Sequence, residues 1–372
     1  MKYLTEFRNR PDTENLVRRI RAIPLGGRRV TLMEVCGSHT MAIHRFGLRR
    51  LLPPEVRLVS GPGCPVCVTG VGYLDRALAM ARLPGVTLAT FGDMVRVPGS
   101  RESLAGARAS GADVRVVTST LDAVRLAREN PGRRVVFLGI GFETTSPTVA
   151  ASVRQAEAEG VSNYLVLAGH KLIPPAMRLL AAAPDLRVDG FLCPAHVSTI
   201  IGTEPYRFLA ETHGKACVVA GFEPLDILRG VEMLLRQIVE GSPRVENEYS
   251  RVVRPGGNRE ALRLLDEVFA VVDDTWRGFG TMPRSAYAFR DRWAAFDAAA
   301  RLPVDPGPPV EPPGCRCGDV LRGVIDPPEC PLFGSACRPE SPVGACMVSS
   351  EGTCAAWFRH GESVFVEKSV AP

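Results

Sequence analysis

The sequence predicts an α/β protein with parallel sheets that helices cover on both faces. Between residues 28 and 222, short apolar runs rich in β-branched residues alternate with longer amphipathic segments. Near-continuous apolar strands are typical of parallel sheets that are buried on both faces. Because the runs are more numerous than one small α/β unit needs, we expect two α/β domains, at 25–145 and 146–225, in preference to one large sheet.

The apolar runs lie where strands are expected, and each is bounded by turn residues. In chain order they are VTLMEV (around 31–35), VRLVS (56–60), VTLATFG (86–92), VRVVTS (114–119), VVFLGIG (135–141), YLVLAG (164–169), GFLCPAHV (190–197) and ACVVAGF (216–222). The stretches LDRALAMARL and LDAVRLAREN have the 3.6-residue apolar period of covering helices.

The last third of the chain has a different character. Residues 225–302 have a helical pattern, clearest in VEMLLRQIVEG and REALRLLDEVFAVVDD. The Pro/Gly-rich stretch LPVDPGPPVEPPG (302–314) then ends regular structure. The tail beyond it has too few apolar residues for a core of its own, so it needs a metal centre or another cross-link. We therefore expect a third unit at 226–372.

Composition excludes several classes of function. The 45 basic and 40 acidic residues are spread along the chain, with no basic stripe interleaved with aromatics, so we expect no nucleic-acid partner. The first residues lack the apolar core of a secretory signal, and no apolar run approaches the ~18 residues of a membrane helix. We therefore expect a cytoplasmic protein without membrane contact. Eleven cysteines in such a chain favour metal or thiol chemistry over a disulfide framework.

Six of these cysteines crowd into the tail between residues 315 and 354. Prolines and glycines separate them, which lets thiolates converge on one point. The ligand candidates are Cys315 or Cys317, then Cys330, Cys337, Cys346 and Cys354. The spacing favours an iron–sulfur cluster, with structural zinc as the alternative, because zinc sites usually show two close cysteine pairs.

A second cysteine motif, GPGCPVCVTG (61–70), follows the strand VRLVS. Its Cys64 and Cys67 form a CxxC pair at the start of a helix, where the helix-end amides favour a thiolate. This chemistry is either dithiol–disulfide exchange or two-thiolate metal binding.

Three further segments end strands with polar residues. EVCGSHT places Cys36 and His39 after a strand, GFETTSP (141–147) is a candidate anion-binding turn, and PAHVSTIIG carries His196. Each is a weak signal alone, since such cysteines and histidines are more often structural. No P-loop, dinucleotide fingerprint or HExxH motif occurs, so we expect neither a nucleotide-driven nor a hydride-transferring enzyme.

Taken together and in this order, the segments EVCGSHT, GPGCPVC, GFETTSP, PAHVSTIIG and CGDVLRG…CPLFG…PVGACMVSSEGTC closely resemble the HypD family of hydrogenase maturation proteins. The resemblance implies two similar α/β domains and a third domain, built from both terminal segments, that carries a [4Fe–4S] cluster. Residues 1–24 would then join the C-terminal unit. The family's spacing C-x14-C-x6-C-x16-C fits Cys315, Cys330, Cys337 and Cys354, which leaves Cys317 and Cys346 as spare thiols.

The resemblance also implies a role for each remaining motif. Cys36 corresponds to the residue that holds iron, and Cys64 and Cys67 to a redox pair. The lining of the site would comprise His39, Glu143, Thr144, Thr145 and His196. The family usually has CGGHT, whereas this chain has Ser38, whose Cβ restricts the backbone where glycine is free.

By resemblance, the protein is a scaffold more than an enzyme. It would work with a HypC-type chaperone while iron acquires two cyanides and one carbon monoxide, with HypE and HypF supplying cyanide. The alternative is an iron–sulfur-dependent thiol–disulfide reductase that uses Cys64 and Cys67. A zinc-stapled interaction module is a third possibility.

Overall fold

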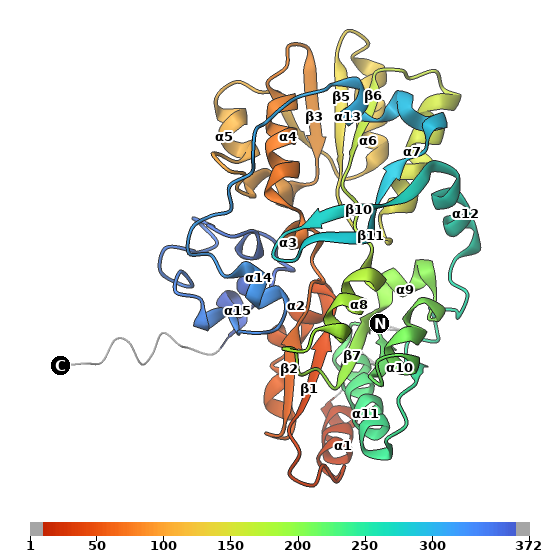
Figure 1. Ribbon diagram of the computed structural model, residues 1–372, viewed down its shortest axis with the longest axis vertical. Coiled ribbons are helices and arrows are strands. Elements are labelled where there is room, and N and C mark those ends of the chain that lie inside the picture. The colour runs from red at the N-terminus through yellow and green to blue at the C-terminus, as the bar shows by residue number, and fades with distance from the viewer. Residues whose placement is uncertain (1–9, 362–372) are drawn as a thin grey trace, which may run out of the picture.

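The computed structural model describes residues 10–361, and their apolar strands form two parallel sheets stacked along the long axis of the molecule (Figure 1). The strands are β1 Val30–Glu34, β2 Val56–Ser60, β3 Val86–Thr90, β4 Val114–Val116, β5 Arg134–Gly139, β6 Tyr164–Ala168, β7 Gly190–Pro194, β8 Ala216–Ala220, β9 Val245–Asn247, β10 Phe269–Trp276 and β11 Gly280–Phe289. The α/β class is therefore confirmed, as is a strand in each of the eight apolar runs.

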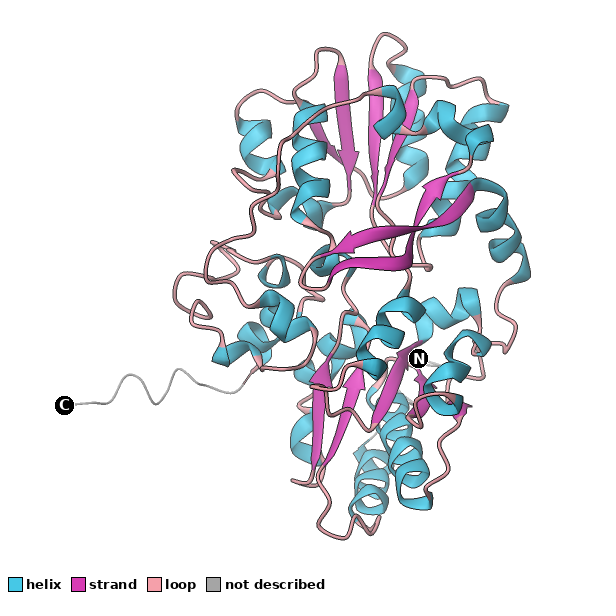
Figure 2. Cartoon of the chain, in the orientation of Figure 1, coloured by secondary structure: helices cyan, strands magenta, loops and turns pink. Residues whose placement is uncertain are grey.

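Helices cover both sheets, as the amphipathic segments predict (Figure 2). The α-helices are α1 Arg10–Arg21, α2 Gly37–Arg45, α3 Pro65–Val68, α4 Val71–Ala81, α5 Leu104–Ala109, α6 Thr120–Glu129, α7 Ser146–Ala158, α8 Ile173–Ala182, α9 Ala195–Ile201, α10 Arg207–Glu211, α11 Pro224–Glu240, α12 Arg259–Val268, α13 Ala298–Arg301, α14 Cys317–Leu321 and α15 Thr353–His360. Within residues 10–361, no helix is both long and apolar enough to span a membrane.

The two sheets do not follow the contiguous ranges 25–145 and 146–225 that we expected. The lower sheet in Figure 1 has the order β2-β1-β7-β8-β9, so it takes strands from both ends of the α/β region. The upper sheet, β4-β3-β5-β6, is inserted between them in the sequence. The link is the pairing of β1 with β7, in which Leu32 lies opposite Gly190. A local apolar pattern identifies a strand but not its neighbour, and the expected boundaries fail for that reason.

Two other expectations differ from the structure. α1 packs on α11 in the core of the lower sheet, where Arg19 pairs with Glu232 at 2.7 Å, so residues 10–21 do not join the cysteine-rich unit. Residues 1–9 of that expectation lie outside the described part. The stretch FAVVDD is not helical, because it forms the start of β10, which pairs antiparallel with β11. Its alternating exposed and half-buried residues suit a two-stranded ribbon.

The cysteine-rich region packs beside the junction of the two sheets (Figure 1). Residues 303–314 have no regular structure, as their prolines predict. Beyond them, Val320, Met347 and Ala355 belong to the same apolar core as Met33 of β1 and Leu88 of β3. The apolar residues of the cysteine-rich region are therefore buried against residues of both sheets.

Candidate functional site

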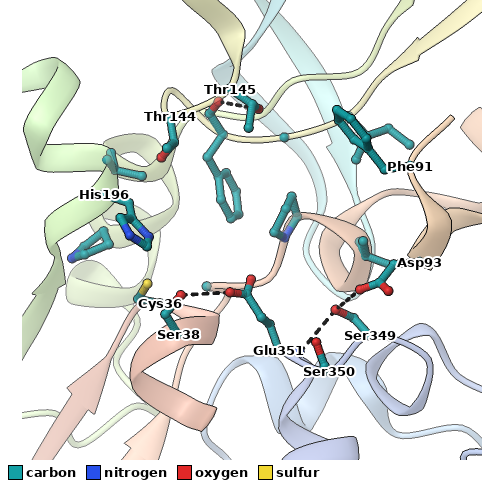
Figure 3. A pocket seen from close by; sticks show the side chains of 18 of the residues that line it. Cys36, Ser38, Phe91, Asp93, Thr144, Thr145, His196, Ser349, Ser350 and Glu351 are labelled. Carbon is teal, nitrogen blue, oxygen red and sulfur yellow. Dashed lines mark hydrogen bonds between the residues drawn. The ribbon is translucent and has the colours of Figure 1, made fainter. Parts of the chain in front are cut away.

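The carboxyl ends of strands from both sheets face one cavity of about 470 Å³ (Figure 3). Crevices at the carboxyl ends of parallel strands are the usual ligand sites of α/β proteins. Here two such ends oppose each other. The residues that line the cavity include Cys36 and Ser38 after β1, Gly63 after β2, Phe91 and Asp93 after β3, Thr144 and Thr145 after β5, His196 after β7, and Ser349 to Glu351 from the cysteine-rich region.

Cys36 lies in the turn between β1 and α2 and is held by Glu34. The Cys36 amide donates to Glu34 Oε2 at 3.1 Å, and the Thr40 hydroxyl donates to Glu34 Oε1 at 2.5 Å. The Cys36 side chain is 7% exposed. Its burial, reinforced by the Glu351 carboxylate, raises the pKa of Cys36 to about 12. A thiolate at Cys36 therefore needs a compensating positive charge, such as a metal ion.

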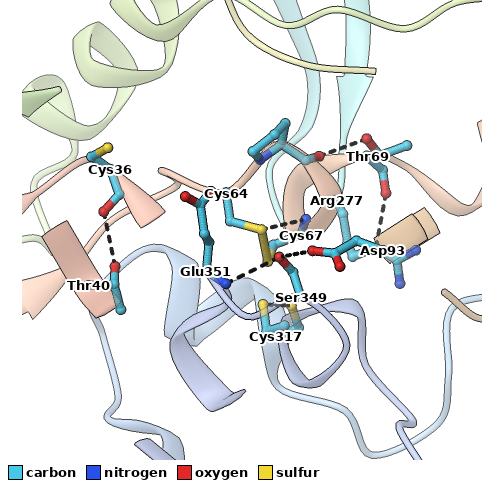
Figure 4. The surroundings of a disulfide bond; sticks show 12 residues. Cys36, Thr40, Cys64, Cys67, Thr69, Asp93, Arg277, Cys317, Ser349 and Glu351 are labelled. Carbon is cyan, nitrogen blue, oxygen red and sulfur yellow. Dashed lines mark hydrogen bonds between the residues drawn. A yellow bond between two sulfur atoms is a disulfide. The ribbon is translucent and has the colours of Figure 1, made fainter. Parts of the chain in front are cut away.

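The CxxC segment lies directly beside the Cys36 turn. Cys64 and Cys67 form a disulfide at the start of α3, where the Cys67 amide also donates to Cys64 Sγ at 3.3 Å (Figure 4). The Gly37 amide donates to the Gly63 carbonyl at 3.0 Å, so the two loops are joined through their backbones. The two sulfurs are buried, and Gly63 and Pro65 face the cavity in their place.

The six tail cysteines line one small pocket with Leu332, Phe333 and Met347. Gly344 makes room for them, since a Cβ at this position would lie 2.7 Å from Cys315 Sγ. Such an all-thiol donor set with apolar surroundings fits an iron–sulfur cluster. Within the described residues, no three Cys, His, Asp or Glu side chains converge closely enough to hold a single metal ion.

Comparison with known proteins shows the family to which the chain belongs. Residues 12–361 match the HypD family model, described as "Hydrogenase formation hypA family". The chain is 47% identical over 369 residues to the hydrogenase maturation factor HypD2 of Bradyrhizobium diazoefficiens, with 97% of each chain covered. It is 47% identical over 368 residues to HypD of Azotobacter vinelandii, again with 97% of each covered. The chain belongs to the HypD family. HypD of Escherichia coli is 45% identical over 366 residues, with 97% of this chain and 98% of that protein covered.

Three of the five lining residues expected from the HypD resemblance do line the cavity. Thr144 and Thr145 face it from the turn after β5, and His196 faces it from the start of α9 (Figure 3). The His196 ring lies 4.0 Å from that of Phe222, centroid to centroid. Burial lowers the pKa of His196, so the ring is favoured in its neutral form.

His39, also expected in the lining, lies behind the cavity instead. Its Nε2 donates to the carbonyls of Ala220, the last residue of β8, and Gly221 at 3.0 and 2.9 Å. Burial lowers the pKa of His39 to about 4, which keeps the ring neutral. Because side chains point in different directions around the first turn of α2, Ser38 faces the cavity and His39 faces the sheet.

Glu143 likewise points away from the cavity. Its carboxyl oxygen Oε1 accepts a hydrogen bond from the Ile173 amide at 3.0 Å, which satisfies an amide of the first turn of α8. Burial raises the pKa of Glu143 to about 8. The side chain lines a separate groove between α8 and the β10–β11 ribbon. Successive residues of the GFETT turn face opposite sides, with Glu143 toward the groove and Thr144 toward the cavity. The motif alone does not reveal which residue faces which side.

The sequence reasoning missed two sets of residues. Ser349 and Glu351 line the cavity together with Asp93, and their only signal was membership of the SSEGTC block that resembles the family. Cys317 and Cys346, treated as spare, have sulfurs 2.6 Å apart. Cys317 also lies beside the Cys64–Cys67 disulfide (Figure 4).

Proposed function

We propose that this HypD-family protein is the scaffold on which the Fe(CN)2CO fragment of a [NiFe] hydrogenase is assembled, in complex with a HypC-type chaperone. The observation that supports it most is the position of Cys36 in a cavity that strand ends from both sheets enclose. The iron is the cargo of this site. A thiolate is the protein ligand that best matches an electron-rich iron carrying cyanide and carbon monoxide.

The other lining residues suit such a cargo. The Thr144 hydroxyl and the ring of His196 offer hydrogen-bond donors, which a bound cyanide accepts through nitrogen, whereas the Thr145 hydroxyl donates to the Phe142 carbonyl at 3.3 Å. Phe91 and Val66 supply apolar wall for a carbon monoxide. Fixed donors around a metal orient its ligands and tune it. In this proposal HypE, charged by HypF, brings the cyanide to the cavity.

The buried sulfur groups supply redox capacity in the proposal. Cys315, Cys330, Cys337 and Cys354 would hold the [4Fe–4S] cluster, which when bound supplies single electrons. The Cys64–Cys67 disulfide takes up two electrons and two protons to become two thiols, and returns them when it reforms. The loop that carries the disulfide is hydrogen-bonded through its backbone to the Cys36 turn. In this proposal, oxidation or reduction of the disulfide therefore changes the position of the Cys36 turn.

Infrared spectroscopy of anaerobically purified protein with its HypC-type partner tests this proposal. Cyanide and carbonyl stretching bands are expected for the wild type. The scaffold role would be contradicted if wild-type protein that is active in maturation and fully loaded with iron showed no cyanide or carbonyl bands.

The second candidate is an iron–sulfur-dependent thiol–disulfide reductase, which the Cys64–Cys67 disulfide favours. This reductase needs neither Cys36 nor a chaperone. Stable recovery of a HypC-type protein with the wild type, and its loss with Cys36→Ala, supports the scaffold. Reductase activity that survives Cys36→Ala without any bound chaperone supports the alternative.

A further inference from the structure

A short loop of the cysteine-rich region is hydrogen-bonded to both α/β halves at the cavity. The Ser38 hydroxyl, after β1 of the lower sheet, donates to Glu351 Oε1 at 2.8 Å. The Ser349 hydroxyl donates to Asp93 Oδ2 at 2.8 Å, and Asp93 follows β3 of the upper sheet. Figure 3 shows both bonds on the same side of the cavity, two residues apart in the loop.

The loop itself is tightly folded. The Glu351 amide donates to Ser349 Oγ at 3.2 Å, and the Gly352 amide donates to the Ser349 carbonyl at 3.0 Å. Ser349 is 2% exposed, so water does not compete well for its bond to Asp93. A displacement of Ser349 is therefore transmitted to Glu351, and a displacement of Glu351 to Ser349.

The loop also lies as close to the Cys36 turn as the chain permits. A Cβ on Gly37 would lie 2.5 Å from Glu351 Cβ, a distance that real side chains essentially never reach. Gly37 directly follows Cys36, so a displacement of Glu351 moves the neighbour of the proposed iron ligand. On the other side, Arg96 of the segment Gly92–Arg96 donates to the Pro339 carbonyl at 3.0 Å, which adds a second contact from the upper half.

We propose that the segment Ser349–Glu351 is a brace, anchored to Asp93 and to Ser38, that holds the two α/β halves together across the cavity and positions the Cys36 turn. Ser349 and Glu351 are positioning residues, since they act on Cys36 through Ser38, Gly37 and Asp93. The inference rests on the proposed function only in naming the cavity as the iron site.

The brace predicts how often Cys36 becomes accessible. Cys36 lines the cavity, but its side chain is only 7% exposed, so the rate at which an alkylating reagent labels it rises with the population of locally opened states. A tenfold change in an equilibrium corresponds to about 1.4 kcal/mol, close to the lower end of what a hydrogen bond to a charged acceptor contributes. We expect Ser38→Ala and Ser349→Ala each to raise the labelling rate of Cys36 about tenfold.

Iodoacetamide labelling of the intact anaerobic protein, followed by tryptic mass spectrometry, measures this rate. The tryptic peptide of residues 30–45 carries Cys36 as its single cysteine. Ser38→Thr keeps the hydroxyl and should label like the wild type. Ser341→Ala is the matched control and should also leave the rate unchanged, because Ser341 is an exposed residue of the same region that bonds to Arg338 through its backbone.

The double variant Ser38→Ala/Ser349→Ala distinguishes a brace from two separate contacts. If one brace connects the halves, releasing the second end after the first adds less than a further tenfold. Additive effects, or Ser38→Ala labelling like Ser341→Ala, would overturn the proposal. If Ser349→Ala fails to fold, the labelling rates of Cys36 in Ser38→Ala and Ser38→Thr are compared. Equal rates in these two variants would overturn the proposal. The labelling needs no bound iron, so missing infrared bands in the wild type would overturn the proposed function and leave the brace intact.

Discussion

Replacing Gly63 by alanine should disturb the Cys36 turn and the CxxC loop together. An alanine Cβ at this position would lie 2.2 Å from the Cys36 amide nitrogen and 2.4 Å from its Cα. These are backbone atoms, so no rotamer change relieves the clash. The Gly63 carbonyl also accepts the Gly37 amide at 3.0 Å, and any shift that admits the methyl group lengthens that bond.

The expected cost follows from these two effects. Overpacking a tight site costs about 1–3 kcal/mol. We expect a cost toward the upper end of this range at Gly63, because the clash is with backbone atoms of Cys36. A weakened backbone hydrogen bond adds about 1 kcal/mol. We therefore expect Gly63→Ala to lower the free energy of unfolding by roughly 2–4 kcal/mol. Gly132 is a matched control, because a Cβ there meets no atom within 4 Å.

Urea unfolding followed by tryptophan fluorescence, with Cys36 alkylation as a local readout, tests this expectation. Gly63→Ala should unfold at lower urea and label faster at Cys36, and it should fail in hydrogenase maturation. Gly132→Ala should be neutral or slightly stabilising, since alanine restricts the unfolded chain. If the two variants unfold and label alike, the two loops do not make the close approach on which the argument depends.

Three further predictions concern the cysteines. Cys36→Ala should abolish maturation and remove the cyanide and carbonyl infrared bands while the protein stays brown, and normal maturation by this variant would refute the ligand role. Cys330→Ser should lose iron and acid-labile sulfide on elemental analysis, whereas Cys317→Ser should retain both, and the opposite result would mean that the ligands are misassigned. Because both sulfurs are buried, alkylation is carried out in denaturant, where Cys64 and Cys67 should both label in reduced protein and neither in oxidised protein. Equal labelling in the two states would exclude a reversible disulfide.

Local patterns carried much of the prediction of the fold. Seven of the eight apolar runs became strands of five or six residues, because burial in a parallel sheet demands continuous apolar sequence. The eighth, β4, is a three-residue edge strand in which only Val114 is buried. The region 269–289 shows the limit of such patterns. Its Phe269 and Val271 continue the helical period of α12, but the chain forms β10 because β11 is present to pair with it.

The candidate site shows the same division. Cys36 and His196 follow the neighbouring strands β1 and β7 of one sheet, and parallel strands end on one edge, so their motifs predicted residues that do share one cavity. Thr144 follows β5 of the other sheet and reaches the same cavity because the carboxyl ends of the two sheets oppose each other. His39 and Glu143 belong to the same motifs but satisfy buried backbone groups instead. Their direction depends on carbonyl and amide partners far away in the sequence, which a motif does not contain.

The sequence by itself therefore determined the α/β class, the position of every strand of the two parallel sheets except the short edge strand β9, and the cysteine-bearing turns, because each depends on interactions between residues close in the chain. Only the tertiary structure decided that β7 returns to pair with β1, that the carboxyl ends of the two sheets oppose each other, and that Glu351 reaches Ser38 from 313 positions away. These features depend on which buried surfaces and polar groups find each other when the whole chain folds, and that choice is made by packing across the molecule.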